Sequence, residues 1–250
     1  MSPLFKYFGS KWTSSFYYSA PVGEVCEPFA GSACYSLRWG VERAVLLDTD
    51  DRVCALWEYL IHVSPDEIRA LPLLSVGDRV SALGLPYEQR LLLSCWVNTS
   101  PWRDTMGGAN RSLSLWGEAA RERVANNVQR IRGWRVLHAD YTAAPESATT
   151  FVDPPYQRMG RHYREGCKKL DYAALGAWCR SRNGLVIACE QEGADWLPWN
   201  GTVPSRRTAR KDDHGQQRGG DSVMYREVCW TSSEVTEPFL SLAATKAKAR

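Results

Sequence analysis

Short apolar runs alternate along the chain with longer segments whose apolar residues recur at helical spacing. Runs of strand length occupy residues 23–27, 43–47, 150–152 and 184–189, and strict alternation marks residues 223–230. Helical spacing marks residues 34–39, 51–62, 86–97, 115–132 and 170–182. This succession predicts an alternating α/β chain.

Two stretches between these elements are polar. Residues 98–111 are rich in turn-forming residues and precede the longest helical segment, residues 115–132. That segment is amphipathic, with arginines on one side and an apolar stripe on the other. The stripe consists of Trp116, Ala120, Val124, Val128 and Ile131. Nearer the C-terminal end, residues 202–208 are expected to pair with the strand at 223–230, with a loop at 211–220 between them.

The composition is that of a globular protein. With 250 residues and 28.2 kDa, the chain can form one large core and a small appended lobe. No apolar run reaches the length of a membrane span. Eight cysteines lack paired C-x-x-C spacing, which argues against a zinc site or a disulfide framework. We therefore expect a cytoplasmic protein with reduced cysteines, no metal and no membrane partner.

The net charge is only +3, but cationic residues gather in two runs. The runs contain Arg158, Arg161, Arg164, Lys168 and Lys169, and then Arg206, Arg207, Arg210 and Lys211. Such runs can form a solvated face, or they can bind the phosphates of a nucleic acid with an affinity that falls steeply with salt. The first run directly follows the motif described next, which favours the phosphate interpretation.

The most specific motif is the tetrapeptide Asp153, Pro154, Pro155 and Tyr156, which follows the apolar run at 150–152. An exocyclic amine on a nucleobase is a poor nucleophile, because its lone pair is delocalised into the ring. A carboxylate can accept one of its N–H groups and a proline carbonyl the other, which directs the lone pair at an electrophile. The prolines fix that carbonyl, and the tyrosine offers a flipped base a stacking surface. The alternative is a Pro-Pro turn that merely follows a buried strand.

An earlier segment has the form of a nucleotide-type cofactor site. The strand at 23–27 is followed by a tight turn at 28–33 and by the helical segment at 34–39. Gly31 allows the turn to approach a ligand closely, and Asp48, after the next strand, can hydrogen-bond ribose hydroxyls. By itself this pattern fits a nicotinamide cofactor as well as another adenosine-bearing cofactor.

Three blocks make the chain resemble the adenine-specific DNA methyltransferases of the Dam type, which take their methyl group from S-adenosylmethionine. Residues 5–11 are similar to the N-terminal cofactor motif of the family, residues 27–33 to its Phe-x-Gly-x-Gly turn, and residues 153–156 to its catalytic tetrapeptide. This order is that of the alpha group, in which the target-recognition region lies between the last two blocks. The likeness is strongest at residues 5–48 and 136–163.

The resemblance implies roles for individual residues. Lys11 would lie near the methionine carboxylate of the cofactor, although a surface lysine is the alternative, and Asp48 and Asp140 would hold its ribose and its adenine. The implied cofactor-binding residues are Tyr7, Lys11, Glu27, Pro28, Phe29, Ala30, Gly31, Ser32, Asp48, Asp140 and Tyr141, and the implied catalytic residues are Asp153, Pro154, Pro155 and Tyr156. One position departs from the family, because Ala33 stands where a second glycine is usual.

The resemblance also implies a Rossmann-like class I methyltransferase fold, with a mixed, seven-stranded, mostly parallel sheet that ends in an antiparallel hairpin. Residues 1–62 and 133–240 would form the cofactor-binding catalytic domain. Residues 63–132 would form a small inserted recognition lobe of helices and loops, and residues 241–250 a solvated basic tail.

Double-stranded DNA is the expected partner, bound by a monomer or a weak dimer. The candidate contacts are Trp102, Arg103, Arg111, Arg158, Arg161, Arg164, Arg206 and Arg207. Arginine can read guanine edges or hold phosphate, and Trp102 lies in a polar loop where it can meet a partner. Other tryptophans are assigned to the core, namely Trp39, Trp57, Trp134 and Trp230.

The sequence thus predicts a site-specific enzyme that flips an adenine out of the duplex and methylates its N6 amino group, as phage or restriction-modification enzymes do. Three alternatives stay open. The target could be cytosine N4 or an RNA base, because the tetrapeptide meets only an amino group on a planar ring. The chain could instead keep the cofactor fold and act through partner contacts, or be a nicotinamide enzyme, although no hydride-transfer site is evident.

Overall fold

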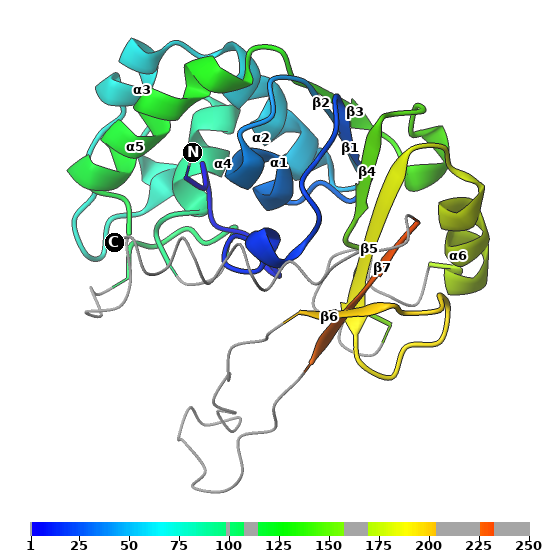
Figure 1. The fold of residues 1–250 in the computed structure, drawn as a ribbon. Coiled ribbons are helices and arrows are strands. Elements are labelled where there is room, and N and C mark those ends of the chain that lie inside the picture. Colours follow the sequence, from blue (N-terminus) through cyan, green and yellow to red (C-terminus); the bar gives the residue numbers. More distant parts are fainter. Residues whose placement is uncertain (1, 99–100, 108–114, 158–169, 204–225, 233–250) are drawn as a thin grey trace, which may run out of the picture.

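A computed structural model describes residues 2–98, 101–107, 115–157, 170–203 and 226–232, which form an α/β fold around a seven-stranded sheet (Figure 1). The strands are β1 (Val25–Glu27), β2 (Ala44–Asp48), β3 (Arg135–His138), β4 (Thr149–Val152), β5 (Leu185–Gln191), β6 (Gly201–Val203) and β7 (Glu227–Thr231). Their order in the sheet is β3-β2-β1-β4-β5-β7-β6.

The sheet is mixed. Strands β3, β2, β1, β4 and β5 run parallel, whereas β7 is antiparallel to both β5 and β6. The expected mostly parallel, seven-stranded sheet with a final antiparallel hairpin is therefore confirmed. This arrangement is compatible with a Rossmann-like fold.

Helices cover both faces of the sheet. They are α1 (Cys34–Trp39), α2 (Asp51–His62), α3 (Pro65–Ala70), α4 (Tyr87–Ser94), α5 (Glu118–Val128) and α6 (Tyr172–Ser181). Short 3-10 helices are η1 (Ser15–Tyr17), η2 (Val80–Ala82), η3 (Gln129–Ile131) and η4 (Tyr141–Ala143). Helices α1 to α5 lie on one side of the sheet and α6 lies on the other (Figure 1).

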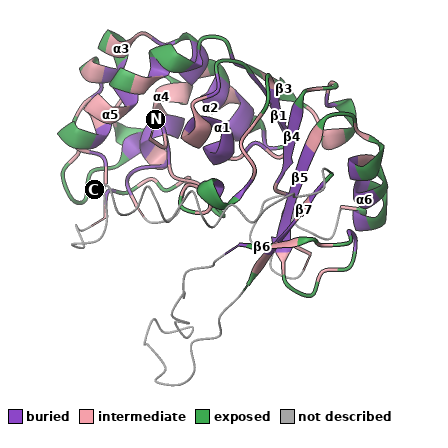
Figure 2. Cartoon of the chain, viewed as in Figure 1, coloured by how far each residue is buried: buried purple, intermediate pink, exposed green. Residues whose placement is uncertain are grey.

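The side chains of the central strands alternate between these two faces, as the period of a strand requires. Leu46, Phe151 and Ile187 pack in the core on the side of α1 and α2. Val152 and Ala188 pack with α6. Because both faces are covered, β4 and β5 are buried along most of their length, whereas α3 and α6 have exposed outer surfaces (Figure 2). This explains why the strands appear in the sequence as continuous apolar runs.

The predicted helix at 51–62 is confirmed as α2, whose N-terminal cap Asp50 accepts a hydrogen bond from the backbone of Arg52. The helix expected at 115–132 begins only at Glu118, because the backbone of Gly117 is extended. The helix expected at 86–97 is shorter and ends at Ser94.

Helix α3 was not predicted, because a helix of six residues is too short to show an apolar stripe. Its start is nevertheless marked in the sequence. Ser64 and Glu67 form a reciprocal capping box, and Pro65 occupies the first turn. These local signals could have revealed the helix.

The segment proposed as a recognition lobe, residues 63–132, shares its core with the sheet. Leu92, Trp96 and Val124 belong to the same continuous cluster of buried residues as Leu46. The indole N–H of Trp96 also donates to the Leu4 carbonyl at 3.1 Å, which ties the segment to the N-terminal block. The boundary at residue 63 stays a prediction, but the segment is packed firmly against the rest of the chain.

The tryptophans assigned to the core do pack against it. Trp57 and Trp134 are buried, and Trp39 and Trp230 are half-buried against core clusters. The seven cysteines within the described ranges are free and buried. Across the part of the chain that the structure describes, no helix is both long and apolar enough to cross a bilayer.

Candidate functional site

A cavity of about 430 Å³ is lined by residues at the carboxyl ends of three strands. Glu27 ends β1, Asp48 ends β2, and Asp153 directly follows β4. Helix α1 follows β1 on one side of the sheet, whereas α6 follows β4 on the other (Figure 1). Neighbouring strands β1 and β4 thus mark the point at which the chain changes sides, where open α/β sheets bind their ligands.

The structure brings the predicted cofactor-binding residues together. All eleven line this one cavity, although they come from the N-terminal block, the turn after β1, the end of β2 and the segment after β3. Sequence motifs that are far apart in the chain therefore converge on one site. Their individual contacts to a cofactor stay predictions.

The turn after β1 presents its backbone to the cavity. Gly31 has a left-handed φ of 43°, and a Cβ at this position would lie 3.0 Å from Cδ1 of Tyr7. The indole N–H of Trp57 donates to the Gly31 carbonyl at 2.8 Å. Only glycine leaves room here for the Tyr7 ring, so the turn and the N-terminal block fit each other because this residue has no side chain.

Ala33 occupies the position at which the family usually has its second glycine. It caps the start of α1 with a left-handed φ of 42°, and its side chain is buried. This conformation costs an L-residue roughly 1 kcal/mol. The alanine is therefore accommodated, but under backbone strain.

Two carboxylates on the turn side of the cavity, which we define as residues 27–35 and 48–50, are bound by backbone groups. Asp48 accepts hydrogen bonds from the N–H groups of Gly31 at 3.0 Å and Asp50 at 2.9 Å. Glu27 accepts from the N–H of Ser36 at 2.8 Å. Burial raises the pKa of Glu27 to about 7 and that of Asp48 to about 6, because desolvation outweighs these hydrogen bonds.

Aromatic rings form another part of the cavity wall. Phe29 and Tyr141 stack with their ring centroids 5.9 Å apart and an interplanar angle of 23°. Asp140 begins η4 by accepting a hydrogen bond from the N–H of Thr142 at 2.8 Å, and its carboxylate also lines the cavity. Flat rings beside a hydrogen-bond acceptor are a surface that suits a purine.

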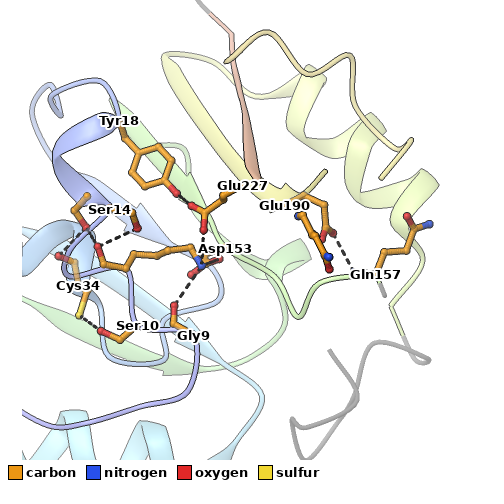
Figure 3. Close-up of polar contacts among 12 residues, drawn as sticks. Gly9, Ser10, Ser14, Tyr18, Cys34, Asp153, Gln157, Glu190 and Glu227 are labelled. Atoms are coloured by element: carbon orange, nitrogen blue, oxygen red, sulfur yellow. Dashed lines mark hydrogen bonds and ion pairs between the residues drawn. The ribbon is translucent and has the colours of Figure 1, made fainter. Parts of the chain in front are cut away.

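The tetrapeptide and the N-terminal block meet on what we call the clamp side of the cavity, formed by Lys11, Asp153 and Pro155. The Nζ atom of Lys11 lies 2.8 Å from Oδ1 of Asp153 and 3.9 Å from Oε2 of Glu227. It also lies 4.7 Å from the centre of the Tyr156 ring. Figure 3 shows Asp153 and Glu227 close together, so one buried ammonium contacts two carboxylates.

The charges on the clamp side depend on one another. Burial lowers the pKa of Lys11, but Asp153, Tyr156 and Glu227 outweigh this and hold it well above its usual range. Burial raises the pKa of Asp153 and of Glu227, and the ammonium opposes both rises. Lys11 therefore stays charged, and its ammonium is the group that opposes protonation of the two acids.

The four predicted catalytic residues occupy different positions. Asp153 and Pro155 line the cavity, Pro154 is buried, and Tyr156 lies against the Lys11 ammonium. Stacking of a base on Tyr156 stays a prediction.

Two acids near the tetrapeptide were not selected from the sequence. Glu190, fully buried in β5, accepts a hydrogen bond from the N–H of Gln157 at 3.1 Å and so holds the chain directly after the tetrapeptide. Like Asp48, it lies at the end of an apolar run, so the same signal could have revealed it. Glu227 begins β7 and accepts a hydrogen bond from the Tyr18 hydroxyl. Its alternating strand gives no such signal, because polar residues there are expected to face solvent.

Most of the predicted nucleic-acid contacts lie outside the described residues, namely Arg111, Arg158, Arg161, Arg164, Arg206 and Arg207. Trp102, which the sequence placed in a polar loop where it can meet a partner, packs against neighbouring side chains. It is half-buried with a left-handed φ of 59°, its ring centroid 6.2 Å from that of Tyr7 and 4.8 Å from the guanidinium of Arg52. Arg103 is exposed.

Trp102 and Arg103 help to line a second, more open groove of about 290 Å³, which also includes Arg52, Tyr87 and Arg90. The contact between Trp102 and Tyr7 places this groove next to the first cavity. Arg52 is ion-paired with Asp50 at 2.6 Å, and Asp104 adds a carboxylate to the lining. Arg90, Arg103 and the two aromatic rings form the part of the groove that suits phosphate and base groups.

The chain matches no protein-family model and no curated protein sequence.

Proposed function

We propose that the chain is a class I S-adenosylmethionine-dependent methyltransferase that acts on the exocyclic N6 of adenine in double-stranded DNA. One observation carries the proposal: Asp153, at the end of β4, lines the same cavity as the glycine turn at the end of β1. A carboxylate that can accept an amine N–H thus lies beside a surface that suits an adenosine-bearing cofactor.

The residues on the turn side fit this cofactor. A volume of about 430 Å³ is of the size that small-molecule sites have. The Phe29 and Tyr141 rings offer a place for an adenine, and the absence of a side chain on Gly31 leaves the backbone open to close approach. When bound, S-adenosylmethionine supplies a methyl group on a positively charged sulfur, which keeps the electron pair of the broken S–C bond.

On the clamp side, the chain prepares the amine. Asp153 accepts one N–H. We assign the other to the carbonyl of Pro154, which lies in the chain between two residues of the cavity wall, Asp153 and Pro155. The nitrogen lone pair is then free to form the new N–C bond. One proton then leaves the methylated nitrogen for solvent. Asp153 acts as a hydrogen-bond acceptor and not as a strong base, because the nitrogen becomes acidic as it forms the bond.

The second groove supports a nucleic acid as the partner. Arg90 and Arg103 can neutralise phosphates, and the exposed ring of Tyr87 can stack on a base beside the reacting one. The choice of adenine in DNA rests on the likeness of the three sequence blocks to the Dam-type enzymes.

The proposal is tested by comparing Asp153→Ala with the unaltered chain. We expect the variant to bind S-adenosylmethionine with an affinity within about threefold by calorimetry, because Asp153 is assigned to the substrate amine and not to the cofactor. Transfer of radiolabelled methyl to unmethylated genomic DNA should fall by about 100- to 1000-fold. Asp66→Ala, which removes an exposed acid of α3, is the control and should change neither quantity. Full methyl transfer by Asp153→Ala would refute the role assigned to the tetrapeptide.

A further inference from the structure

The N-terminal block fixes the backbone of Lys11 but leaves its ammonium a choice of partners. The Lys11 carbonyl accepts hydrogen bonds from the backbone N–H of Ser15 at 2.7 Å and from its hydroxyl at 2.6 Å. At the other end of the side chain, Nζ donates to the Gly9 carbonyl at 3.2 Å and lies between two carboxylates. The flexible stem allows the ammonium to shift from one acid to the other while the backbone stays in place.

In this structure, Lys11 takes the hydrogen-bonding position that the proposed function needs for the substrate. Its ammonium, an N–H donor, lies 2.8 Å from Oδ1 of Asp153. A substrate amine is also an N–H donor and must reach the same carboxylate. The two groups therefore compete for Oδ1 of Asp153, and the ammonium has to move before the amine can bind that oxygen.

A displaced ammonium needs another partner, because Lys11 is only 6% exposed and an unpaired charge is costly in a buried site. The carboxylate of Glu227 already lies 3.9 Å from Nζ. The Tyr18 hydroxyl, donating to the other oxygen of Glu227, holds this acid in place and directs it toward the clamp side (Figure 3).

We propose that Glu227 is a positioning residue, which takes over the Lys11 ammonium when the amino group of the substrate binds Asp153. The inference rests on the proposed function. The exchange creates no new charge, because the ammonium passes between two carboxylates while the vacated one receives the N–H of the substrate. Without Glu227, Lys11 would stay on Asp153 and exclude the amine.

Other titratable groups surround this pair. Tyr156 contacts Lys11, Cys189 of β5 and Glu27 of β1 interact with Asp153, and Cys229 of β7 interacts with Glu227. Burial raises the pKa of the tyrosine and of both thiols above their usual values, so these three groups stay neutral near pH 7. Glu190 of β5 also interacts with Asp153, and burial raises its pKa. The acid limb of activity, the fall in kcat/KM at low pH, therefore depends on Asp153, Glu227, Glu27 and Glu190.

The test is the steady-state kinetics of Glu227→Gln with unmethylated genomic DNA. We expect kcat/KM for DNA to fall about tenfold, because Lys11 now competes for Asp153 without an alternative partner. Affinity for S-adenosylmethionine should stay within about threefold. In this variant Lys11 forms an ion pair with Asp153 alone, which lowers the pKa of the Asp153 carboxyl. The acid limb of kcat/KM should therefore move to lower pH. A residue with only a structural role would not shift this limb.

Two further variants complete the experiment. Glu192→Gln removes an exposed carboxylate just beyond β5 and should leave both the rate and the acid limb unchanged. Glu227→Asp keeps the charge and should recover most of kcat/KM, and it carries the test if thermal melting shows that Glu227→Gln does not fold.

The possible outcomes separate the two proposals. If the unaltered chain does not methylate nucleic acid, the proposed function and this inference fail together. If the unaltered chain is active and Glu227→Gln shows the same kcat/KM and the same acid limb, only the inference is overturned.

Discussion

The turn side and the clamp side of the cavity hold their carboxylates in different ways. On the turn side, Asp48 and Glu27 accept hydrogen bonds from backbone N–H groups, which cannot move without unfolding the turn. On the clamp side, Asp153 and Glu227 share one side-chain ammonium, which can move. The turn side is therefore a preformed surface. Under the proposed function, the clamp side exchanges hydrogen-bond partners when the substrate binds.

Removal of the shared ammonium should have the largest effect on stability. In Lys11→Met, Asp153 and Glu227 lose their counter-ion, and we expect the free energy of unfolding at pH 8 to fall by about 3 kcal/mol. The loss should shrink as the pH falls, because protonation of the two acids removes the uncompensated charge. Urea denaturation across this range measures it. Lys6→Met, which removes an ammonium that lies over the Trp96 ring, should cost less than about 1 kcal/mol at any pH.

Neutralising an acid on the turn side should raise the free energy of unfolding, in contrast to the removal of Lys11. The pKa of Glu27 is raised to about 7, so the folded chain holds this proton more tightly than the unfolded chain does. Stability should therefore increase as the pH falls from 8 toward about 4.5, the ordinary value for a glutamate. Glu27→Gln should flatten this dependence and stabilise the fold at pH 8 by about 2 kcal/mol. Glu42→Gln, at an exposed position, should do neither, and equal denaturation profiles for the two variants would contradict the account.

A methyl group added to the glycine turn should change the shape of the surface proposed to bind the cofactor. Gly31→Ala places a Cβ against the Tyr7 ring, whereas Gly84→Ala has a left-handed φ of 64° but open space around the added atom. Both variants should lose roughly 1 kcal/mol of stability to the backbone conformation. Only Gly31→Ala should weaken the binding of S-adenosylmethionine, by about tenfold in calorimetry. Equal affinities in the two variants would show that the contact with Tyr7 does not matter.

The smallest effect is expected at Ala33. Ala33→Gly relieves roughly 1 kcal/mol of strain in the left-handed conformation. It also removes a buried methyl group, which destabilises the fold by about 0.8 kcal/mol. The two terms nearly cancel, so the melting temperature should change by only a few degrees. A large stabilisation would mean that the buried methyl contributes little to packing.

Much of the turn side could be predicted from the sequence, because its signals are local. An apolar run, a glycine turn and a helix ended by Gly40 follow one another directly, and Asp48 ends the next strand. The order of these elements also predicts where the cavity forms, since parallel strands bring their carboxyl ends to one edge of the sheet.

The clamp side could be predicted only in part. The tetrapeptide identified Asp153, but nothing local relates it to Glu227, which reaches the site through antiparallel pairing of β7 with β5. The resemblance placed Lys11 near the carboxylate of a cofactor, which stays a prediction. The motif carries no mark of Asp153 and Glu227, the two acids that Lys11 meets in the fold. Contacts between distant elements of this kind follow from strand order and side-chain packing, which the spacing of residues does not encode.

Analysis of the methylated product tests the central claim most directly. Unmethylated DNA would be incubated with the chain and S-adenosylmethionine, digested to nucleosides and examined by mass spectrometry, with RNA in a parallel reaction. The account predicts N6-methyldeoxyadenosine from DNA, and none when Asp153 is replaced by alanine. Methylation only at cytosine N4 or only in RNA would contradict the assigned target, and binding of the cofactor without any methylated nucleoside would contradict the assigned chemistry.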